Sequence, residues 1–99
     1  MFRHVVILKW TETATAEQRL AVRDGLRTLP PLIAEIRNYQ VGVDAGLAPE
    51  GNSDLVVVAD FDDVDGYVVY RDHPAHQEVI AQRIRPILAG RAAVQHDLD

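Results

Sequence analysis

The chain has 99 residues, 47% of them hydrophobic and 25% charged, which suits one folded domain over residues 1–99 and excludes both a disordered tail and a membrane protein. Its formal net charge of −5 argues against nucleic acid as a partner, and the absence of cysteine excludes disulfides, thiolate nucleophiles and metal sites built on sulfur. Since the longest apolar run has five residues (55–59) and a membrane span needs about 20, we expect a protein of the cytoplasm that binds no membrane.

The first half of the chain predicts a strand, a helix and a second strand. Residues 2–10 are rich in β-branched and aromatic residues, as strands are. Thr15 and Gln18 form a capping-box pair, and the apolar spacing after them predicts an amphipathic helix over about 15–28. A second strand fits residues 38–45, and the Gly- and Pro-containing stretch after it predicts a loop.

The second half repeats this order with a longer helical region. Residues 54–61 predict a third strand, whose apolar centre lacks the alternation of a sheet with one wet face. A helix begins near Asp62 or Asp63, is interrupted at His73-Pro74, resumes over 75–88 with a kink at Pro86, and ends at Gly90. Residues 91–98 predict the last strand.

The order β-α-β-β-α-β is typical of the α+β ferredoxin-like fold, a four-stranded antiparallel sheet with its helices on one face. The other face then exposes apolar side chains such as Val5 and Ile7, in a larger patch than monomers usually leave to water. A second copy of the same sheet covers such a patch most simply, under twofold symmetry. We therefore expect a homodimer in the form of a dimeric α+β barrel.

Three short strings add a resemblance to this pattern. They are His4 to Trp10 in the first strand, Tyr39 to Asp44 in the second, and Tyr-x-x-His-Pro-x-His from Tyr70 to His76. Together they resemble the stress-responsive A/B barrel domain (Dabb) family over nearly the whole chain, and the third string is the most specific. The resemblance implies the same fold and the same dimer.

One catalytic branch of this family resembles olivetolic acid cyclase, which closes linear polyketide chains by aldol condensation without metal or cofactor. The resemblance places its catalytic residues on Tyr70 and His76 and a further pocket histidine on His4. Two other polar pocket positions fall on Leu26 and Leu55, so a drier pocket and a different substrate are expected.

The residues themselves support a base and a polarising hydroxyl. An imidazole such as that of His76 accepts protons near neutral pH, and a tyrosine hydroxyl such as that of Tyr70 stabilises a developing enolate. Six residues separate the two, so only the His73-Pro74 break lets both point into one cavity. The alternative is structural: Tyr70 packs in the core, His73 and His76 cap backbone groups, and His4 is a hydrogen-bonded core histidine.

The remaining substrate-binding candidates come from three sources. Val6 and Trp10 share the strand face of His4, His73 lies at the helix break, and Leu26 and Leu55 are the two positions to which the resemblance points. No metal site is expected; the alternative is a magnesium ion held loosely by the acids of residues 60–65. The acids of residues 60–65 resemble a calcium loop but lack its glycine and its final glutamate, and His73 with His76 has no third ligand near it in sequence.

Three functional hypotheses follow for this sequence. The first is a small-molecule pocket for an apolar or poly-oxo ligand, with polyketide-cyclase-like, cofactor-independent activity. The second is a non-catalytic dimeric binding or stress-stability module, whose cavity Trp10 or Phe61 would fill. The third is a monooxygenase-like reaction without cofactor. RNA binding is disfavoured, since the third strand has no surface aromatic residues for base stacking.

Overall fold

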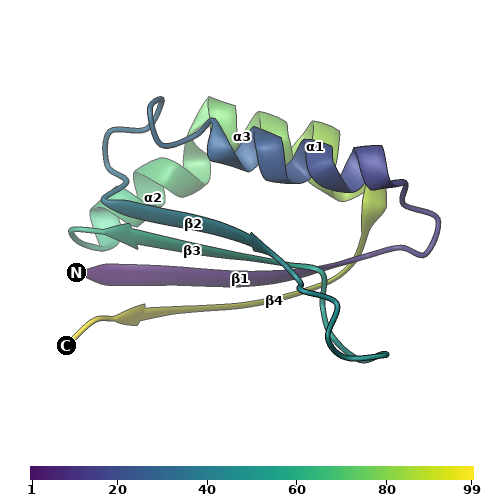
Figure 1. Cartoon of the computed structure of the whole chain (residues 1–99). Helices are drawn as coiled ribbons and strands as arrows, with labels where there is room; N and C mark the ends of the chain where they lie inside the picture. Colours follow the sequence, from purple (N-terminus) through teal and green to yellow (C-terminus); the bar gives the residue numbers. More distant parts are fainter.

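The computed structural model describes all 99 residues as one antiparallel sheet with helices packed on one of its faces (Figure 1). The strands follow the spatial order β2-β3-β1-β4, which confirms the ferredoxin-like topology. The elements are β1 (Phe2–Trp10), α1 (Ala16–Arg27), β2 (Asn38–Val43), β3 (Leu55–Phe61), α2 (Val64–Asp72), α3 (Pro74–Val79), the π-helical turn η1 (Ile80–Ile84), the 3₁₀ turn η2 (Arg85–Ile87) and β4 (Leu88–Asp97).

The register of the central strand β1 separates the two faces of the sheet. His4 lies between Ala59 of β3 and Gln95 of β4. Neighbouring Val5 lies between the valines at 58 and 94, on the opposite face, because side chains alternate along a strand. The inner face therefore carries the even-numbered residues of β1 toward the helices, and the outer face carries the odd-numbered ones away from them.

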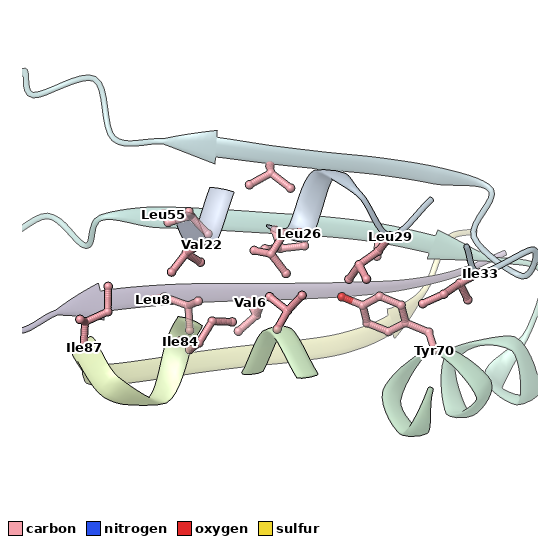
Figure 2. Close-up of a cluster of buried hydrophobic side chains, with 14 of the residues drawn as sticks. Val6, Leu8, Val22, Leu26, Leu29, Ile33, Leu55, Tyr70, Ile84 and Ile87 are labelled. Carbon is pink, nitrogen blue, oxygen red and sulfur yellow. The ribbon is translucent and has the colours of Figure 1, made fainter. Parts of the chain in front are cut away.

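The hydrophobic core fills the space between the inner face and the helices. Figure 2 shows Val22 and Leu26 of α1 opposite Leu8 and Val6 of β1, with Tyr70 at one end of the cluster. Burying each such aliphatic side chain contributes roughly 1.5–3 kcal/mol, so this layer holds α1 and the second helical region on the sheet.

The helical region after α3 ends earlier than the sequence predicts. Gly90 does not terminate a helix; it lies within β4, which begins at Leu88. The expected change at Pro86 is present, because proline has no N–H to continue the helix. Before Pro86 the helix widens into the π-helical turn η1, in which the N–H of Arg85 donates to the carbonyl oxygen of Ile80. It then tightens into the 3₁₀ turn η2.

The outer face of the sheet has no helix over it. Ile7 of β1 is 40% exposed and Val94 of β4 is 60% exposed on this side. The loop between β2 and β3 projects beyond the sheet, away from the helices (Figure 1), and carries Leu47, which is 91% exposed. No helix of the fold combines the length and the apolar composition needed to cross a membrane.

Candidate functional site

A cavity of about 350 Å³ lies between the inner face of the sheet and the broken helical region. The sheet contributes residues of β1, β3 and β4, and α1 contributes Leu26. Most of the lining is hydrophobic. The lining residues are His4, Val6, Leu8, Leu26, Val57, Tyr67, Tyr70, Arg71, His76, Gln77, Ile80, Ile84, Arg85, Leu88 and Arg91.

The break between α2 and α3 builds one wall of this cavity. His73 has an extended backbone, as expected of a residue before proline, and its Nδ1 accepts the N–H of Ala75 at 3.1 Å. The break leaves the carbonyl oxygen of Arg71 without its helical partner. That oxygen instead accepts hydrogen bonds from His76 Nδ1 at 3.0 Å and from Gln77 Nε2 at 2.6 Å. The interrupted helix therefore fixes the orientation of the His76 ring.

The hydrogen bond of His76 also determines which ring nitrogen is basic. A carbonyl oxygen only accepts, so Nδ1 of His76 carries the proton and Nε2 of the neutral ring holds a free lone pair. The ring lies on that of Tyr70, with centroids 4.1 Å apart. Partial burial lowers the pKa of His76, so the neutral, basic form is favoured near pH 7.

Tyr70 places its hydroxyl inside the core, next to a second tyrosine. Its side chain is 2% exposed, and its oxygen lies 2.9 Å from the hydroxyl oxygen of Tyr39 on β2. Burial raises the pKa of Tyr70 to about 12 and also raises the pKa of Tyr39. Both hydroxyls are therefore protonated at neutral pH, and each is available as a hydrogen-bond donor.

His4 closes the cavity on the sheet side. It is 5% exposed, and its Nδ1 accepts a hydrogen bond from the amide nitrogen of Gln95 at 2.8 Å, which leaves the proton of the neutral ring on Nε2. Desolvation lowers the pKa of His4 to about 4, with smaller contributions from the positive charges of Arg91 and His76. His4 is therefore a neutral donor at pH 7, whereas His76 presents an acceptor.

Comparison with known proteins decides the family. A sequence model of the stress-responsive A/B barrel domain matches residues 2–97. The chain belongs to the Dabb family. A dimeric ferredoxin-like protein of unknown function from Thermobifida fusca is 45% identical, with a TM-score of 0.88 over 98% of this chain and 90% of that one. No protein of curated function shows a significant sequence match.

More distant structures share the fold of this Dabb domain. A Dabb family protein from Mesorhizobium loti is 15% identical, with a TM-score of 0.80 over 98% of this chain and 95% of that one. A hydroxynitrile lyase from Passiflora edulis is also 15% identical, with a TM-score of 0.83 over 99% of this chain and 93% of that one.

The Dabb domain brings five of the eight site residues expected from the sequence to one cavity. They are His4, Val6, Leu26, Tyr70 and His76. The other three lie elsewhere. Trp10 and Leu55 line a separate hollow beside the start of α1, and His73 caps the backbone at the helix break. Neither Trp10 nor Phe61 lines the cavity or fills it.

Two residues at or beside the cavity, Arg91 and Tyr39, are not singled out as site residues by the sequence. Tyr39 of β2 lies outside the cavity lining, and its hydroxyl meets that of Tyr70 because α2 packs over the neighbouring strands β3 and β1. Arg91 faces the cavity because it pairs with Leu8 in the register of β1 and β4. Placing the start of β4 at Leu88, together with the alternation rule, is the signal that would have found it.

The acidic residues near the start of α2 have partners within the protein. Asp60 accepts two hydrogen bonds from Arg3, at 2.7 and 2.9 Å. Asp62 pairs with Arg37, and Asp63 caps α2 through the N–H of Gly66. Across the chain, no three His, Asp or Glu side chains gather closely enough to share a metal ion.

Proposed function

We propose that this Dabb protein binds a small apolar or poly-oxo ligand in its cavity and catalyses a cofactor-independent proton transfer of the aldol type. One observation carries the proposal: the hydrogen bond from His76 Nδ1 to the Arg71 carbonyl leaves Nε2 as a free base, on a ring packed against Tyr70 at the wall of a 350 Å³ cavity. A base, a protonated hydroxyl and an apolar enclosure are the parts that enolate chemistry requires.

The proposed reaction begins with the removal of a proton from the carbon between two carbonyl groups of the ligand. Nε2 of His76 accepts this proton, the C–H bond breaks, and its electron pair forms an enolate. The Tyr70 hydroxyl donates a hydrogen bond to the enolate oxygen. The enolate carbon then bonds to a second carbonyl carbon of the same chain, and the resulting alkoxide takes the proton back from His76.

Two neighbouring groups support these roles. Donation from the Tyr39 hydroxyl to the Tyr70 oxygen, 2.9 Å away, leaves the Tyr70 proton free for the ligand. His4 offers a second donor, its Nε2 proton, from the sheet side. That a protein named as a hydroxynitrile lyase has this fold supports an enzyme of lyase type, and the open cavity favours ligand binding over a purely structural module.

Proton exchange at a model compound tests this function directly. We expect the protein to accelerate deuterium exchange at the central carbon of a 1,3-diketone and to cyclise a trial poly-β-keto thioester. His76→Ala removes the base and should slow both reactions by about 100-fold or more, the usual contribution of a general base. Tyr70→Phe should slow cyclisation strongly while the domain stays folded. Proton NMR follows the exchange.

His96→Ala is the matched control, because it removes an exposed histidine on β4 that lies outside the cavity lining. It should react at the wild-type rate. Wild-type rates in both His76→Ala and Tyr70→Phe would rule out the mechanism.

We also propose that the protein is a homodimer joined through the outer face of the sheet. Val5, Ile7 and Val94 leave this face apolar, and the loop between β2 and β3, which contains the exposed Leu47, extends away from the helices (Figure 1). The 45% identical protein from Thermobifida fusca is described as dimeric. A second copy seated on this face would bury both the valine-rich sheet and the loop that carries Leu47.

A further inference from the structure

The arginines of the chain fall into two groups according to whether another group of the protein binds them. Seven of the nine donate to a carboxylate or to a backbone carbonyl. These are Arg3, Arg19, Arg23, Arg27, Arg37, Arg71 and Arg83. Arg85 of η2 and Arg91 of β4 have no such partner, and both line the cavity. The two free guanidinium groups therefore belong to the same site.

The charge around this cavity is opposite to that of the whole chain. The protein has 15 acidic and 10 basic residues, yet no aspartate or glutamate lines the cavity. Its charged lining consists of Arg71, Arg85 and Arg91, and only Arg71 is neutralised, by Asp72 at 2.9 Å. A net-negative protein thus surrounds one apolar space with uncompensated positive charge.

The two free arginines lie at the entrance of the cavity. Arg85 and Arg91 are exposed residues that line the cavity, so they lie where it opens to solvent. The positive charge of Arg91 also contributes to lowering the pKa of His4 inside the cavity. Because Arg85 and Arg91 line the same cavity as Tyr70 and His76, one ligand that fills the cavity can contact all four side chains.

We propose that the ligand is an apolar or poly-oxo acid whose single carboxylate binds Arg85 and Arg91 at the cavity mouth while its body occupies the space beside Tyr70 and His76. This proposal rests on the proposed function, for which it names the substrate class. Arginine suits this role, because its planar fork binds both oxygens of a carboxylate. Binding of the carboxylate also orients the ligand, so that the apolar end opposite the carboxylate lies against Leu26 and Val6.

Binding of matched probes tests the proposal. The probes are 4-butylbenzoate and its neutral analogue 4-butylbenzamide, titrated by isothermal calorimetry. We expect the wild type to bind the benzoate at least about tenfold more tightly than the amide. The double variant R85Q/R91Q should lose this preference and keep its affinity for the amide. Arg23→Gln removes one cation on α1, outside the cavity, and should behave as wild type.

The outcomes separate this proposal from the proposed function. Equal affinity for benzoate and amide, or a preference that survives in R85Q/R91Q, overturns the carboxylate site and leaves the proton-transfer function standing. Failure to bind either probe also overturns the carboxylate site. The deuterium exchange of the diketone tests the proposed proton transfer independently of either probe. Tenfold tighter binding of 4-butylphenyl phosphate than of the benzoate would assign the arginines to a phosphate and overturn the carboxylate.

Discussion

His76 and His4 differ in which ring nitrogen carries the proton, because each ring makes a different hydrogen bond through Nδ1. The Arg71 carbonyl takes the Nδ1 proton of His76, and the Gln95 amide gives a proton to Nδ1 of His4. The neutral rings thus present an acceptor and a donor on their Nε2 atoms. The same cavity then holds a base and a hydrogen-bond donor without any difference in residue type.

The burial of His4 predicts a loss of stability in mild acid. Its folded pKa of about 4 lies below the ordinary value of 6.5, so between these values the unfolded chain binds a proton that the folded chain excludes. The free energy of unfolding therefore falls as the pH drops through this window, and at pH 5 it is lower than at pH 7 by about 2 kcal/mol. The lowered pKa of His76 acts in the same direction. Urea unfolding at pH 7 and pH 5 measures the sum.

His4→Gln isolates the contribution of one histidine. It should unfold with a smaller difference between the two pH values than the wild type, because glutamine does not titrate. His96→Gln removes an exposed histidine instead and should keep the wild-type difference. An unchanged difference in His4→Gln would show that burial does not suppress protonation at this position.

Among single residues, the resemblance to the Dabb family points to His4, Tyr70 and His76, and the structure places all three side chains at one cavity. The His73-Pro74 break explains how Tyr70 and His76, six residues apart, reach the same space. Arg85 and Arg91 were not identifiable in this way, because arginine is common on protein surfaces and only the folded chain shows which guanidinium groups lack partners.

Local signals positioned the first helix accurately, because capping is a short-range interaction. Thr15 Oγ1 accepts the N–H of Gln18 at 3.1 Å, and Gln18 Oε1 accepts the N–H of Thr15 at 2.9 Å. This box fixes the start of α1, and with it the depth at which Leu26 enters the cavity wall. Sequence alone places such a helix within a residue of its observed start.

Thr15→Ala should therefore destabilise the domain by about 1 kcal/mol, the usual cost of losing an N-cap oxygen. The midpoint of urea unfolding should fall with no change in the slope of the transition. Thr13→Ala, three residues before α1 at an exposed position, should leave the midpoint within error of wild type. Equal midpoints for Thr15→Ala and wild type would mean that packing alone holds the start of α1.

The last helix and strand were harder to delimit because their boundary depends on tertiary contacts. Gly90 is a helix terminator in many sequences, yet here it pairs with Lys9 in the sheet, next to the irregularity between Lys9 and Trp10. The pairing of β4 along the whole of β1 outweighs the local preference of one glycine. Helical spacing continued to residue 88 in the sequence, but Pro86 and the sheet end the helix before it.

At the scale of the whole molecule, the two faces of the sheet differ in what covers them. The inner face buries His4 and lines the cavity, whereas the outer face leaves apolar side chains such as Ile7 and Val94 exposed. The alternation of side chains along β1 is enough to predict this division. The sequence also predicts that two helices cover only one face. It contains no comparable signal for the size of the cavity, which depends on how the helix break at His73 packs over the sheet.

The proposed dimer makes a prediction for charges placed on the outer face. In dilute solution the wild type should sediment at twice the chain mass of 11.0 kDa. Ile7→Glu and Val94→Glu each put an unpaired carboxylate where the second sheet would pack, and burying it should weaken association by about 100-fold or more. Both variants should sediment as monomers at micromolar concentration. Val64→Glu makes a similar change at an exposed position at the start of α2, where an acid suits the helix, and should remain dimeric. Circular dichroism confirms that each variant is folded.

A folded wild type that sediments at 11.0 kDa at micromolar concentration would contradict the dimer.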